Sequence, residues 1–448
     1  MDICKDVLLT DLYQLNMAYA YGAGGLDGEA VFEFFVRRLP ERRNFLMAAG
    51  LEQALDFLEG FRFSAEDLDW LKACGRFDDR FVARMAQVRF TGSVHAVPEG
   101  TIVFPDEPIL RVTAPLPQAQ LVETRLINIL HFQTIVASKA ARAVLAAPGK
   151  LLVDFGLRRA HGAEAGLMAA RASYLAGFDG TATVLAGALW DIPLYGTMAH
   201  SFIQAHDSEA AAFEAFARAR PKGLVLLIDT YDTVTAAHEV VRLAPKLGAA
   251  GVRLDGVRLD SGDLVALSRA VRDVFDQGGL KDVTIFASGG LDEDDLVRFA
   301  RAEAPIDGYG VGASLTTSSD APVLDCAYKL EEYAGVARRK RSPGKATWPG
   351  RKQVWRRYGA DGAMAGDLLA LEGAAHDGEP LLRPVMLDGR RLPGPTLPES
   401  RAHAAASLSR LPARLRDLET AARYEVDIGE DVLRLTEQVD ARVAQAVP

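Results

Sequence analysis

Two patterns of hydrophobic and polar positions divide this chain. In its first third, apolar residues recur at helical spacing over residues 7–21 and 45–60. Residues 88–113 instead alternate between apolar and polar positions, and glycine and proline interrupt the alternation. This part of the chain is predicted to form helices and a small antiparallel β unit.

From residue 151 the pattern changes to short aliphatic runs, each followed by a polar or glycine-containing turn and a helical segment. Such an order is typical of β/α units around a parallel sheet. We therefore predict an irregular parallel β/α barrel with an N-terminal α+β domain and a C-terminal extension; the alternative is a doubly wound open sheet. The expected strands are 151–154, 225–229, 257–260, 283–288 and 306–311, and the expected segments are 1–148, 149–322 and 323–448, the last packing back on the other two.

The composition is that of a folded protein, with 49% hydrophobic and 25% charged residues among 448. The net charge of −9 argues against general binding to nucleic acid or to an anionic membrane. Residues 338–357 are the exception, because they hold nine basic residues, no acid and two tryptophans. We favour a solvated hairpin or an ATP-attracting rim there over a nucleic-acid patch.

The cysteines and the N-terminal residues bear on location. Three cysteines lie far apart without a CxxC pair, which favours a reducing compartment over a disulfide framework or a structural zinc site. Acidic residues stand where a secretory signal would be cationic, and no uncharged apolar stretch approaches the ~18 residues of a membrane span. We expect a cytoplasmic protein. The residues concerned are Cys4, Cys74 and Cys326, and Asp2, Asp6 and Asp11.

The expected parallel strands all end in polar residues or glycine. Because the carboxyl ends of parallel strands meet at one face, we expect the active site there, in a barrel or in an open sheet. Five short motifs carry the most specific signal. They are residues 10–14 (TDLYQ), 154–159 (DFGLRR), 196–201 (GTMAHS), 258–263 (RLDSGD) and 310–314 (GVGAS).

With these motifs in this order, the chain resembles the nicotinate phosphoribosyltransferase family from about residue 7 to residue 440. The resemblance implies that nicotinate and phosphoribosyl pyrophosphate give nicotinate mononucleotide and pyrophosphate, helped by ATP hydrolysis, in the salvage route to NAD. It further implies a type II phosphoribosyltransferase fold and a homodimer in which the neighbouring subunit completes each site.

That reaction passes through a ribosyl cation-like transition state, and its site needs carboxylates, Mg²⁺ and cations for the phosphates. Arg258 and Asp260 supply such a mixture, and Asp260 with Asp263 could hold Mg²⁺. The alternative for one of these acids is an N-cap of the helix that begins near Leu264.

Glycine-rich strand ends let backbone N–H groups approach a phosphate, although turns also need glycine for steric reasons. The sequence predicts a phosphate cradle from two such segments, namely Ser288, Gly289 and Gly290 with Gly310, Gly312, Ala313 and Ser314.

Nicotinate is a flat ring with a carboxylate, so its site should combine aromatic stacking with an arginine. Phe155 and Arg158 fit this need, although Arg159 could take the place of Arg158. From the family resemblance, Asp11 and Tyr13 arrive from the partner subunit. Ser201 is a further candidate for substrate binding.

His200 stands out among the eight histidines, because in the family the histidine of the Ala-His-Ser motif takes the γ-phosphoryl group of ATP. A neutral imidazole is nucleophilic near pH 7, and the P–N bond that it forms is labile. In the family, Asp229 is the candidate that orients the ring. Three other histidines keep a structural interpretation: His161, His206 and His238.

Ala182 bears on the choice between acid and amide substrates. The amide-using relatives carry an aspartate there, which would suit an NH₂ donor and repel a carboxylate. Residues 225–235 also resemble the type I phosphoribosyltransferase signature, but Thr230 replaces its second acid. Two alternatives stay open: nicotinamide as the acceptor, and a catalytically silent barrel that binds nucleotide.

Overall fold

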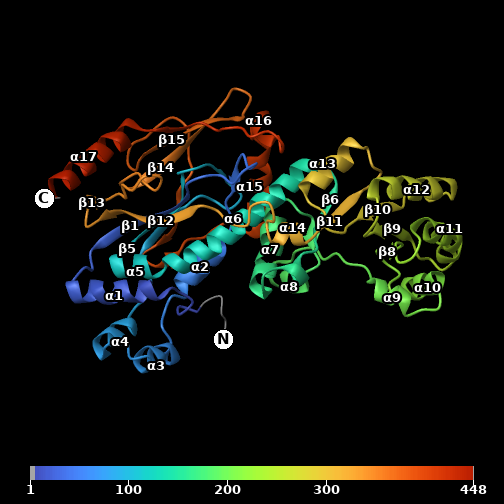
Figure 1. Cartoon of the computed structure of the whole chain (residues 1–448), viewed down its shortest axis with the longest axis horizontal. Coiled ribbons are helices and arrows are strands. Elements are labelled where there is room, and N and C mark those ends of the chain that lie inside the picture. The colour runs from blue at the N-terminus through green and yellow to red at the C-terminus, as the bar shows by residue number, and fades with distance from the viewer. Residues whose placement is uncertain (1–5, 447–448) are drawn as a thin grey trace. The chain divides into compact units, whose positions relative to one another are not determined.

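The computed structural model describes residues 6–446, so Asp2 and Cys4 lie outside the described residues. Contacts divide the chain into two compact units (Figure 1). Unit 1 comprises Met1–Ser138 and Ala321–Pro448, and unit 2 comprises Lys139–Asp320. The division falls within helix α6 (Glu123–Ala146). The finer division into three segments stays a prediction.

A seven-stranded antiparallel sheet organises unit 1. Its strand β1 lies between two strands that are distant in the sequence, β5 and β12. The alternating pattern predicted only a small antiparallel unit, because pairing between distant segments leaves no local signal. In spatial order the strands are β13 (Val336–Ala337), β12 (Cys326–Tyr333), β1 (Glu29–Val36), β5 (Pro108–Pro115), β3 (Ser93–Ala96), β17 (Arg383–Leu387) and β18 (Arg390–Arg391).

Strand β1 is buried from its second residue onward. Phe32 stacks on Tyr328 of β12 with ring centroids 4.9 Å apart. The one charged residue in this buried stretch, Glu33, forms a salt bridge with Lys352, whose Nζ lies 2.8 Å from Glu33 Oε2. Burying a charge is tolerated when it is paired in this way.

A second sheet of unit 1 contains the end of the basic segment 338–357. Six of its nine basic residues form ion pairs with acidic residues of unit 1, so the fold neutralises most of the charge that the sequence concentrates there. The pairs join Arg339 and Arg341 to Asp440, Arg351 to Glu29 and Glu332, Lys352 to Glu33, Arg356 to Asp367, and Arg357 to Asp427. The strands are β16 (Glu379–Pro380), β14 (Lys352–Tyr358), β15 (Met364–Leu371) and β19 (Val426–Ile428).

Helices complete unit 1, together with a strand pair, β2 (Leu46–Met47) and β4 (Ile102–Val103). The helical spacing in the first third is confirmed in part: the predicted segment 7–21 overlaps α1, and the segment 45–60 contains α2 but begins with strand β2. The helices are α1 (Leu12–Gly24), α2 (Leu51–Glu59), α3 (Ala65–Ala73), α4 (Asp79–Met85), α5 (Leu116–Leu121), α15 (Leu397–Ser409), α16 (Ala413–Arg416) and α17 (Glu430–Ala446).

Unit 2 is built on a curled six-stranded sheet in which all neighbouring strands are parallel. This confirms the predicted parallel β/α architecture, in the form of a half-barrel whose edge strands are β7 and β8. All five expected strands are present; the sequence missed only the two-residue strand β7. In spatial order the strands are β7 (Gly180–Thr181), β6 (Leu151–Asp154), β11 (Gly308–Val311), β10 (Thr284–Ala287), β9 (Leu254–Leu259) and β8 (Leu224–Leu227).

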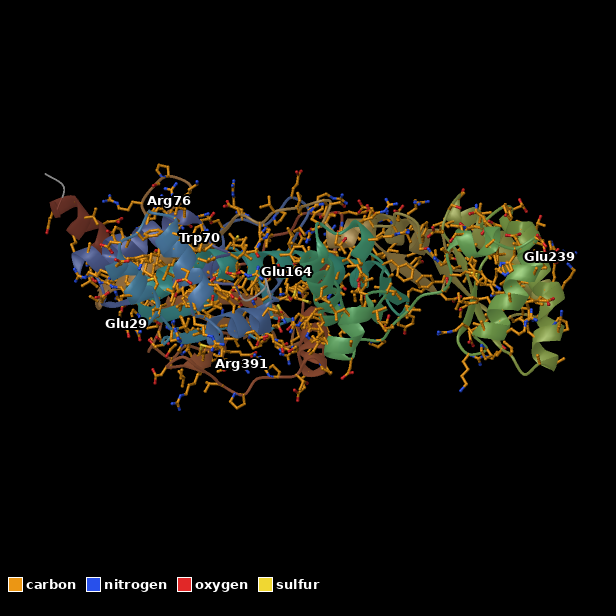
Figure 2. All side chains as sticks on the ribbon, turned by 90° about the horizontal axis from the view of Figure 1, so that it is seen from below. Glu29, Trp70, Arg76, Glu164, Glu239 and Arg391 are labelled. Carbon is orange, nitrogen blue, oxygen red and sulfur yellow. The ribbon has the colours of Figure 1, made fainter. Side chains whose placement is uncertain are left out.

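Helices connect these strands and cover the sheet, as Figure 1 shows for α11 and α12 beside β8, β9 and β10. Glu239 of α11 lies on the outer side of this layer (Figure 2). Among residues 6–446, no helix combines the length and the apolar character needed to cross a membrane. The helices of unit 2 are α7 (Ala163–Ala176), α8 (Val184–Trp190), α9 (His200–Gln204), α10 (Glu209–Ala219), α11 (Thr233–Ala249), α12 (Leu264–Gln277), α13 (Glu293–Arg301) and α14 (Ala313–Thr316), with a short 3₁₀ helix η2 (Leu157–Arg159).

Candidate functional site

A pocket of about 300 Å³ lies at the carboxyl ends of the strands of unit 2. The position follows from the parallel sheet, because each strand delivers the residues that follow it to the same face. The pocket thus gathers residues from four strand ends and from the start of α9. They are Phe155, Leu157, Arg158, Ala182, Gly196, Thr197, Met198, Ala199, His200, Leu227, Arg258 and Asp260.

Arg258 and Asp260 form the charged part of this pocket. Arg258 Nη2 donates to Asp260 Oδ1 at 2.6 Å, and Arg258 Nε donates to Ser288 Oγ at 2.8 Å. Ser288 Oγ in turn donates to Asp260 Oδ1 at 2.5 Å. Burial alone would raise the pKa of Asp260, but these hydrogen bonds and the Arg258 charge outweigh it and hold that pKa below its ordinary value.

Phe155 is held in a turn fixed by the buried Asp154 carboxylate. Gly156 N–H donates to Asp154 Oδ1 at 2.8 Å, and Thr181 Oγ1 donates to Asp154 Oδ2 at 2.7 Å. The Arg258 guanidinium lies 5.5 Å from the centroid of the Phe155 ring, within the range of a cation–π contact. The turn therefore presents an aromatic ring beside the charged pair.

The ring of His200 makes one hydrogen bond within the described structure: Nδ1 lies 3.1 Å from Thr230 Oγ1. His200 Nε2 is 3.8 Å from Asp260 Oδ2, too far for a hydrogen bond. Asp229 Oδ2 accepts from Asp260 N at 2.9 Å and from Ser261 Oγ at 2.7 Å. The residue beside the ring is thus Thr230, and an orienting role for its neighbour Asp229 stays a prediction.

Asp263 caps helix α12, since its Oδ1 accepts from the backbone N–H groups of Val265 and Ala266. The alternative interpretation of this residue as an N-cap is therefore confirmed. Across residues 6–446, no cluster of three or more histidines, cysteines or acids could hold a metal ion. Asp229 Oδ1 is buried without a hydrogen-bond partner, and Asp260 lines the pocket, so these two carboxylates are the candidates for contributing an oxygen to a hard cation.

The predicted phosphate-binding segments serve the packing of the site. A Cβ at Gly289, which has φ +107°, would lie 2.0 Å from the Asp260 carbonyl oxygen. A Cβ at Gly310 would lie 2.6 Å from the Phe155 ring. Steric need explains these glycines, while phosphate binding stays a prediction. The two serines form hydrogen bonds: Ser288 with the charged pair, and Ser314 with the Leu291 carbonyl, to which its hydroxyl donates. Gly290 has a positive φ, and Gly312 lies against the Phe155 backbone. Ala313 is the first residue of α14.

Of the predicted site residues, only Phe155, Arg158, His200, Arg258 and Asp260 line this pocket. Asp11 and Tyr13 belong to unit 1, where Asp11 Oδ2 accepts from Thr124 Oγ1 at 3.0 Å and Tyr13 is exposed at the start of α1. Ser201 is exposed in the first turn of α9. Of the two adjacent arginines, Arg158 lines the pocket and Arg159 does not.

Sequence reasoning missed the contact of Thr230 with His200 and the role of Ser288 in binding both members of the charged pair. Both residues stood in segments that the sequence singled out. Their partners lie 28 or 30 residues away in the sequence, however, and only the folded chain brings them together.

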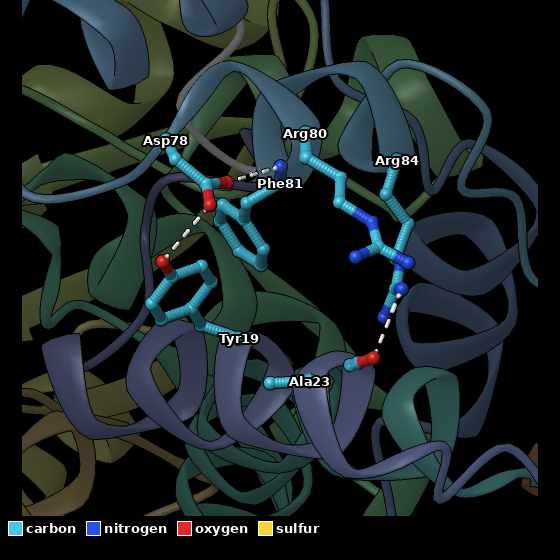
Figure 3. Close-up of a pocket in the computed structure, with 7 residues that line it drawn as sticks. Tyr19, Ala23, Asp78, Arg80, Phe81 and Arg84 are labelled. Atoms are coloured by element: carbon cyan, nitrogen blue, oxygen red, sulfur yellow. Dashed lines mark hydrogen bonds between the residues drawn. The ribbon is translucent and has the colours of Figure 1, made fainter.

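Two cavities in unit 1 contain none of the predicted site residues. Figure 3 shows one of about 70 Å³ between α1 and α4, in which Arg84 Nη2 donates to the Gly22 carbonyl at 3.2 Å, near the C-terminus of α1. An arginine at this position stabilises the C-terminal end of the helix. The other, of about 370 Å³, is lined by Arg383, Arg391 and His403, which bond Glu379, Asp56 and Thr101 respectively.

Three family models match the chain. Residues 8–131 match the nicotinate phosphoribosyltransferase N-terminal domain, residues 151–343 match the nicotinate phosphoribosyltransferase family, and residues 372–436 match the nicotinate phosphoribosyltransferase C-terminal domain.

Individual proteins agree with the family models. The chain is 50% identical over 447 residues to nicotinate phosphoribosyltransferase pncB2 of Mycobacterium tuberculosis, covering 98% of this chain and 96% of the relative. It is 40% identical over 357 residues to nicotinate phosphoribosyltransferase of Bacillus subtilis, covering 78% and 72%. The crystal structure of human nicotinic acid phosphoribosyltransferase superposes with a TM-score of 0.86 at 33% identity, over 97% of this chain and 99% of that one.

Proposed function

This chain belongs to the nicotinate phosphoribosyltransferase family, and from that premise we propose that it joins nicotinate to phosphoribosyl pyrophosphate, giving nicotinate mononucleotide and pyrophosphate in NAD salvage. The nicotinate nitrogen forms the bond to C1 of the ribose, and the bond from C1 to the pyrophosphate oxygen breaks. The observation that carries the proposal is the single pocket that combines Phe155, Arg158, Arg258, Asp260 and His200.

The aromatic and basic side of the pocket suits the acceptor. The pyridine ring would stack on Phe155, and Arg158 would pair with the carboxylate. Ala182 also lines the pocket and leaves no anion to repel that carboxylate. This favours nicotinate over nicotinamide as the acceptor.

Arg258 and Asp260 suit the donor. The guanidinium would offset the negative charge that develops on the departing pyrophosphate, and the carboxylate would stabilise the cationic ribose. The glycine-rich segments after β10 and β11 would receive the 5′-phosphate through backbone N–H groups.

Magnesium would need both protein and substrate ligands at this site. Mg²⁺ is usually held by one or two carboxylates together with substrate phosphates. Asp260 lines the pocket and would be the first carboxylate, and Asp229, whose buried Oδ1 has no hydrogen-bond partner, would be the second. Asp263, engaged as a helix cap, is the weaker candidate. When bound, the ion would neutralise phosphate charge.

We assign ATP coupling to His200, which reaches the same pocket. Its ring would take the γ-phosphoryl group, and hydrolysis of the phosphohistidine would drive product formation. A catalytically silent barrel is disfavoured, because a chain that only binds nucleotide has no need of a nucleophile beside the charged pair.

A homodimer with shared sites is part of the proposal. Helix α8 exposes Val184, Leu185 and Leu189, each by more than half, and such an apolar face suits burial against a second copy. Asp11 and Tyr13 would then reach the partner's pocket. We also propose a cytoplasmic location, consistent with free thiols at Cys74 and Cys326.

The test is to incubate the protein with nicotinate, phosphoribosyl pyrophosphate and Mg²⁺, with and without ATP, and to measure mononucleotide and phosphate release together. His200→Ala should lose ATP hydrolysis and an acid-labile phosphoenzyme while slow synthesis without ATP persists. If that variant keeps wild-type stimulation by ATP, the coupling assignment is wrong. If nicotinamide reacts as well as nicotinate, the substrate assignment is wrong.

The shared site has a separate test. Tyr13→Ala and Arg258→Ala proteins, each nearly inactive alone, should regain part of their activity after subunit exchange, because one site of the mixed dimer is then intact. Absence of recovery, with exchange verified by mass, excludes a shared site.

A further inference from the structure

We infer that Thr230 is the positioning residue for His200: its hydroxyl holds the imidazole ring in the orientation in which a ring nitrogen meets the phosphoryl group. This inference rests on the proposed coupling of ATP hydrolysis through His200. It assigns to the strand-end loop after β8 a role that the sequence had suggested for the adjacent acid, Asp229.

The geometry singles out the hydroxyl. Thr230 Oγ1 lies 3.1 Å from His200 Nδ1, within hydrogen-bond range. The His200 side chain is 40% exposed, so packing alone holds the ring loosely. The nearest acid, Asp260, stays 3.8 Å from Nε2 and is already bonded to Arg258 and Ser288.

Asp229 has a different task in the same loop. Its Oδ2 accepts from the backbone N–H of Asp260 and from Ser261 Oγ, so it ties the ends of β8 and β9 together. This tie fixes the backbone from which Thr230 extends. Asp229 therefore acts on His200 through Thr230, one step further from the ring.

A hydroxyl suits the chemistry of this ring. It can accept a hydrogen bond from Nδ1–H or donate one to the Nδ1 lone pair, so the contact holds in either tautomer. A carboxylate in the same place could only accept. Threonine adds stiffness, because its branched Cβ restricts the rotation that would carry the hydroxyl away from the ring.

The step that benefits is phosphoryl transfer. A ring nitrogen lone pair forms the P–N bond to the γ-phosphorus, the bond from that phosphorus to the bridging oxygen breaks, and ADP leaves with its electron pair. A correctly held nucleophile lowers the entropic part of this barrier. Transfer of the ribosyl group to nicotinate makes no use of the His200 ring, so it should not depend on Thr230.

The experiment compares Thr230→Val, which removes the hydroxyl at nearly constant shape, with Thr230→Ser, which keeps it. We expect Thr230→Val to slow phosphoenzyme formation from γ-labelled ATP at least tenfold, through kcat and not through the KM for ATP. Thr230→Ser should stay within about threefold of wild type. Synthesis without ATP and the nicotinate KM should be unchanged in both. Thr235→Val, in the first turn of α11, is the matched control and should behave as wild type.

Each remaining outcome has a defined meaning. If Thr230→Val phosphorylates at the wild-type rate while His200→Ala does not phosphorylate, the inference is wrong and the proposed coupling stands. If His200→Ala still forms the phosphoenzyme, the proposed coupling itself is wrong. An equal loss of synthesis without ATP in Thr230→Val would show general damage and overturn the positioning role. Thr230→Ala supplies a second variant without the hydroxyl, with the same expected result, should the valine protein fold poorly.

Discussion

Two arginine–aspartate pairs, one in each unit, show how similar chemistry serves different ends. Arg356 Nη2 lies 2.5 Å from Asp367 Oδ2 across strands β14 and β15 of unit 1. Arg258 Nη2 lies 2.6 Å from Asp260 Oδ1 at the end of β9 in unit 2. The bond lengths hardly differ, so the surroundings decide what each pair does.

The surroundings of Arg356 shield it from solvent. Its side chain is 1% exposed, its Nη1 donates to the Ile102 carbonyl, and its guanidinium lies over the rings of Phe104 and Tyr424. Tyr424 Oη also donates to Asp367 Oδ1. This pair is enclosed on all sides and can act only on the stability of unit 1.

The surroundings of Arg258 leave it open to a ligand. Its side chain is 15% exposed and that of Asp260 is 25% exposed, and both line the pocket. Ser288 and the Phe155 ring orient the Arg258 guanidinium, but they do not enclose it. A charge that is held in place and still exposed can stabilise charge on a substrate.

The largest expected effect is that of Arg356→Met on stability. Removing one member of a buried pair leaves Asp367 charged and unpaired, which should lower the free energy of unfolding by about 3–5 kcal/mol. Urea unfolding of the purified protein measures it. The double variant Arg356→Met/Asp367→Leu, with no unpaired charge, should recover part of the loss; if it is less stable than the single variant, the pair matters for more than charge.

Arg258→Ala should show the opposite profile. We expect kcat to fall by about 10²–10³, because a donor aimed at developing charge is lost. The free energy of unfolding should stay within about 1 kcal/mol of wild type, since Asp260 is partly exposed and keeps its bond from Ser288. Arg258→Lys, which keeps the charge but not its planar geometry, should be intermediate. An equal loss of stability would place this pair with Arg356 and Asp367.

Arg158→Ala tests which charged residue of the pocket recognises the acceptor. Loss of a charge-assisted contact to the nicotinate carboxylate should cost about 1.5–3 kcal/mol, a rise of the nicotinate KM by about ten- to a hundredfold. Nicotinamide should suffer less. Arg159→Ala is the matched control, because Arg159 is the next residue in the chain but does not line the pocket. Equal losses for acid and amide would contradict the carboxylate role.

Glu107→Gln should give the smallest effect, on the pH dependence of stability. Burial first, and then the neighbouring Asp367, hold the pKa of Glu107 well above its ordinary value of 4.5, against the Arg356 charge. The folded state therefore binds this proton more tightly than the unfolded state does. Its contribution to stability is complete below about pH 4.5 and is lost as pH rises towards the folded pKa.

Glutamine keeps the acceptor for Phe104 N–H and supplies an N–H donor towards Asp367. Unfolding curves of Glu107→Gln between pH 4.5 and 8 should therefore decline less with pH than those of wild type. Parallel curves would mean that Glu107 carries no extra proton in the folded state.

Much of unit 2 could be predicted from the sequence. Each strand of a parallel β/α sheet is a short local run followed by its own turn and helix, so residues such as Leu151–Asp154 carry their own signal. The strand-end rule then placed Phe155, Arg258 and Asp260 at one face without any knowledge of distances, whereas His200 was identified by its motif. Unit 1 was harder, because β1 pairs with strands about 80 and 300 residues away in the chain, and no local pattern encodes such pairing.

The sequence by itself determined which residue types reach the strand ends of unit 2, because a strand's direction and the residue after it are local properties of the chain. Only the tertiary structure decided how these groups are paired. It put Thr230 and not Asp229 against His200, committed Asp263 to a helix end, and neutralised most of the basic segment 338–357 with acids from distant parts of unit 1. The physical reason is that hydrogen bonds and ion pairs require atoms within about 3–4 Å, and such distances between remote residues exist only once the chain has folded.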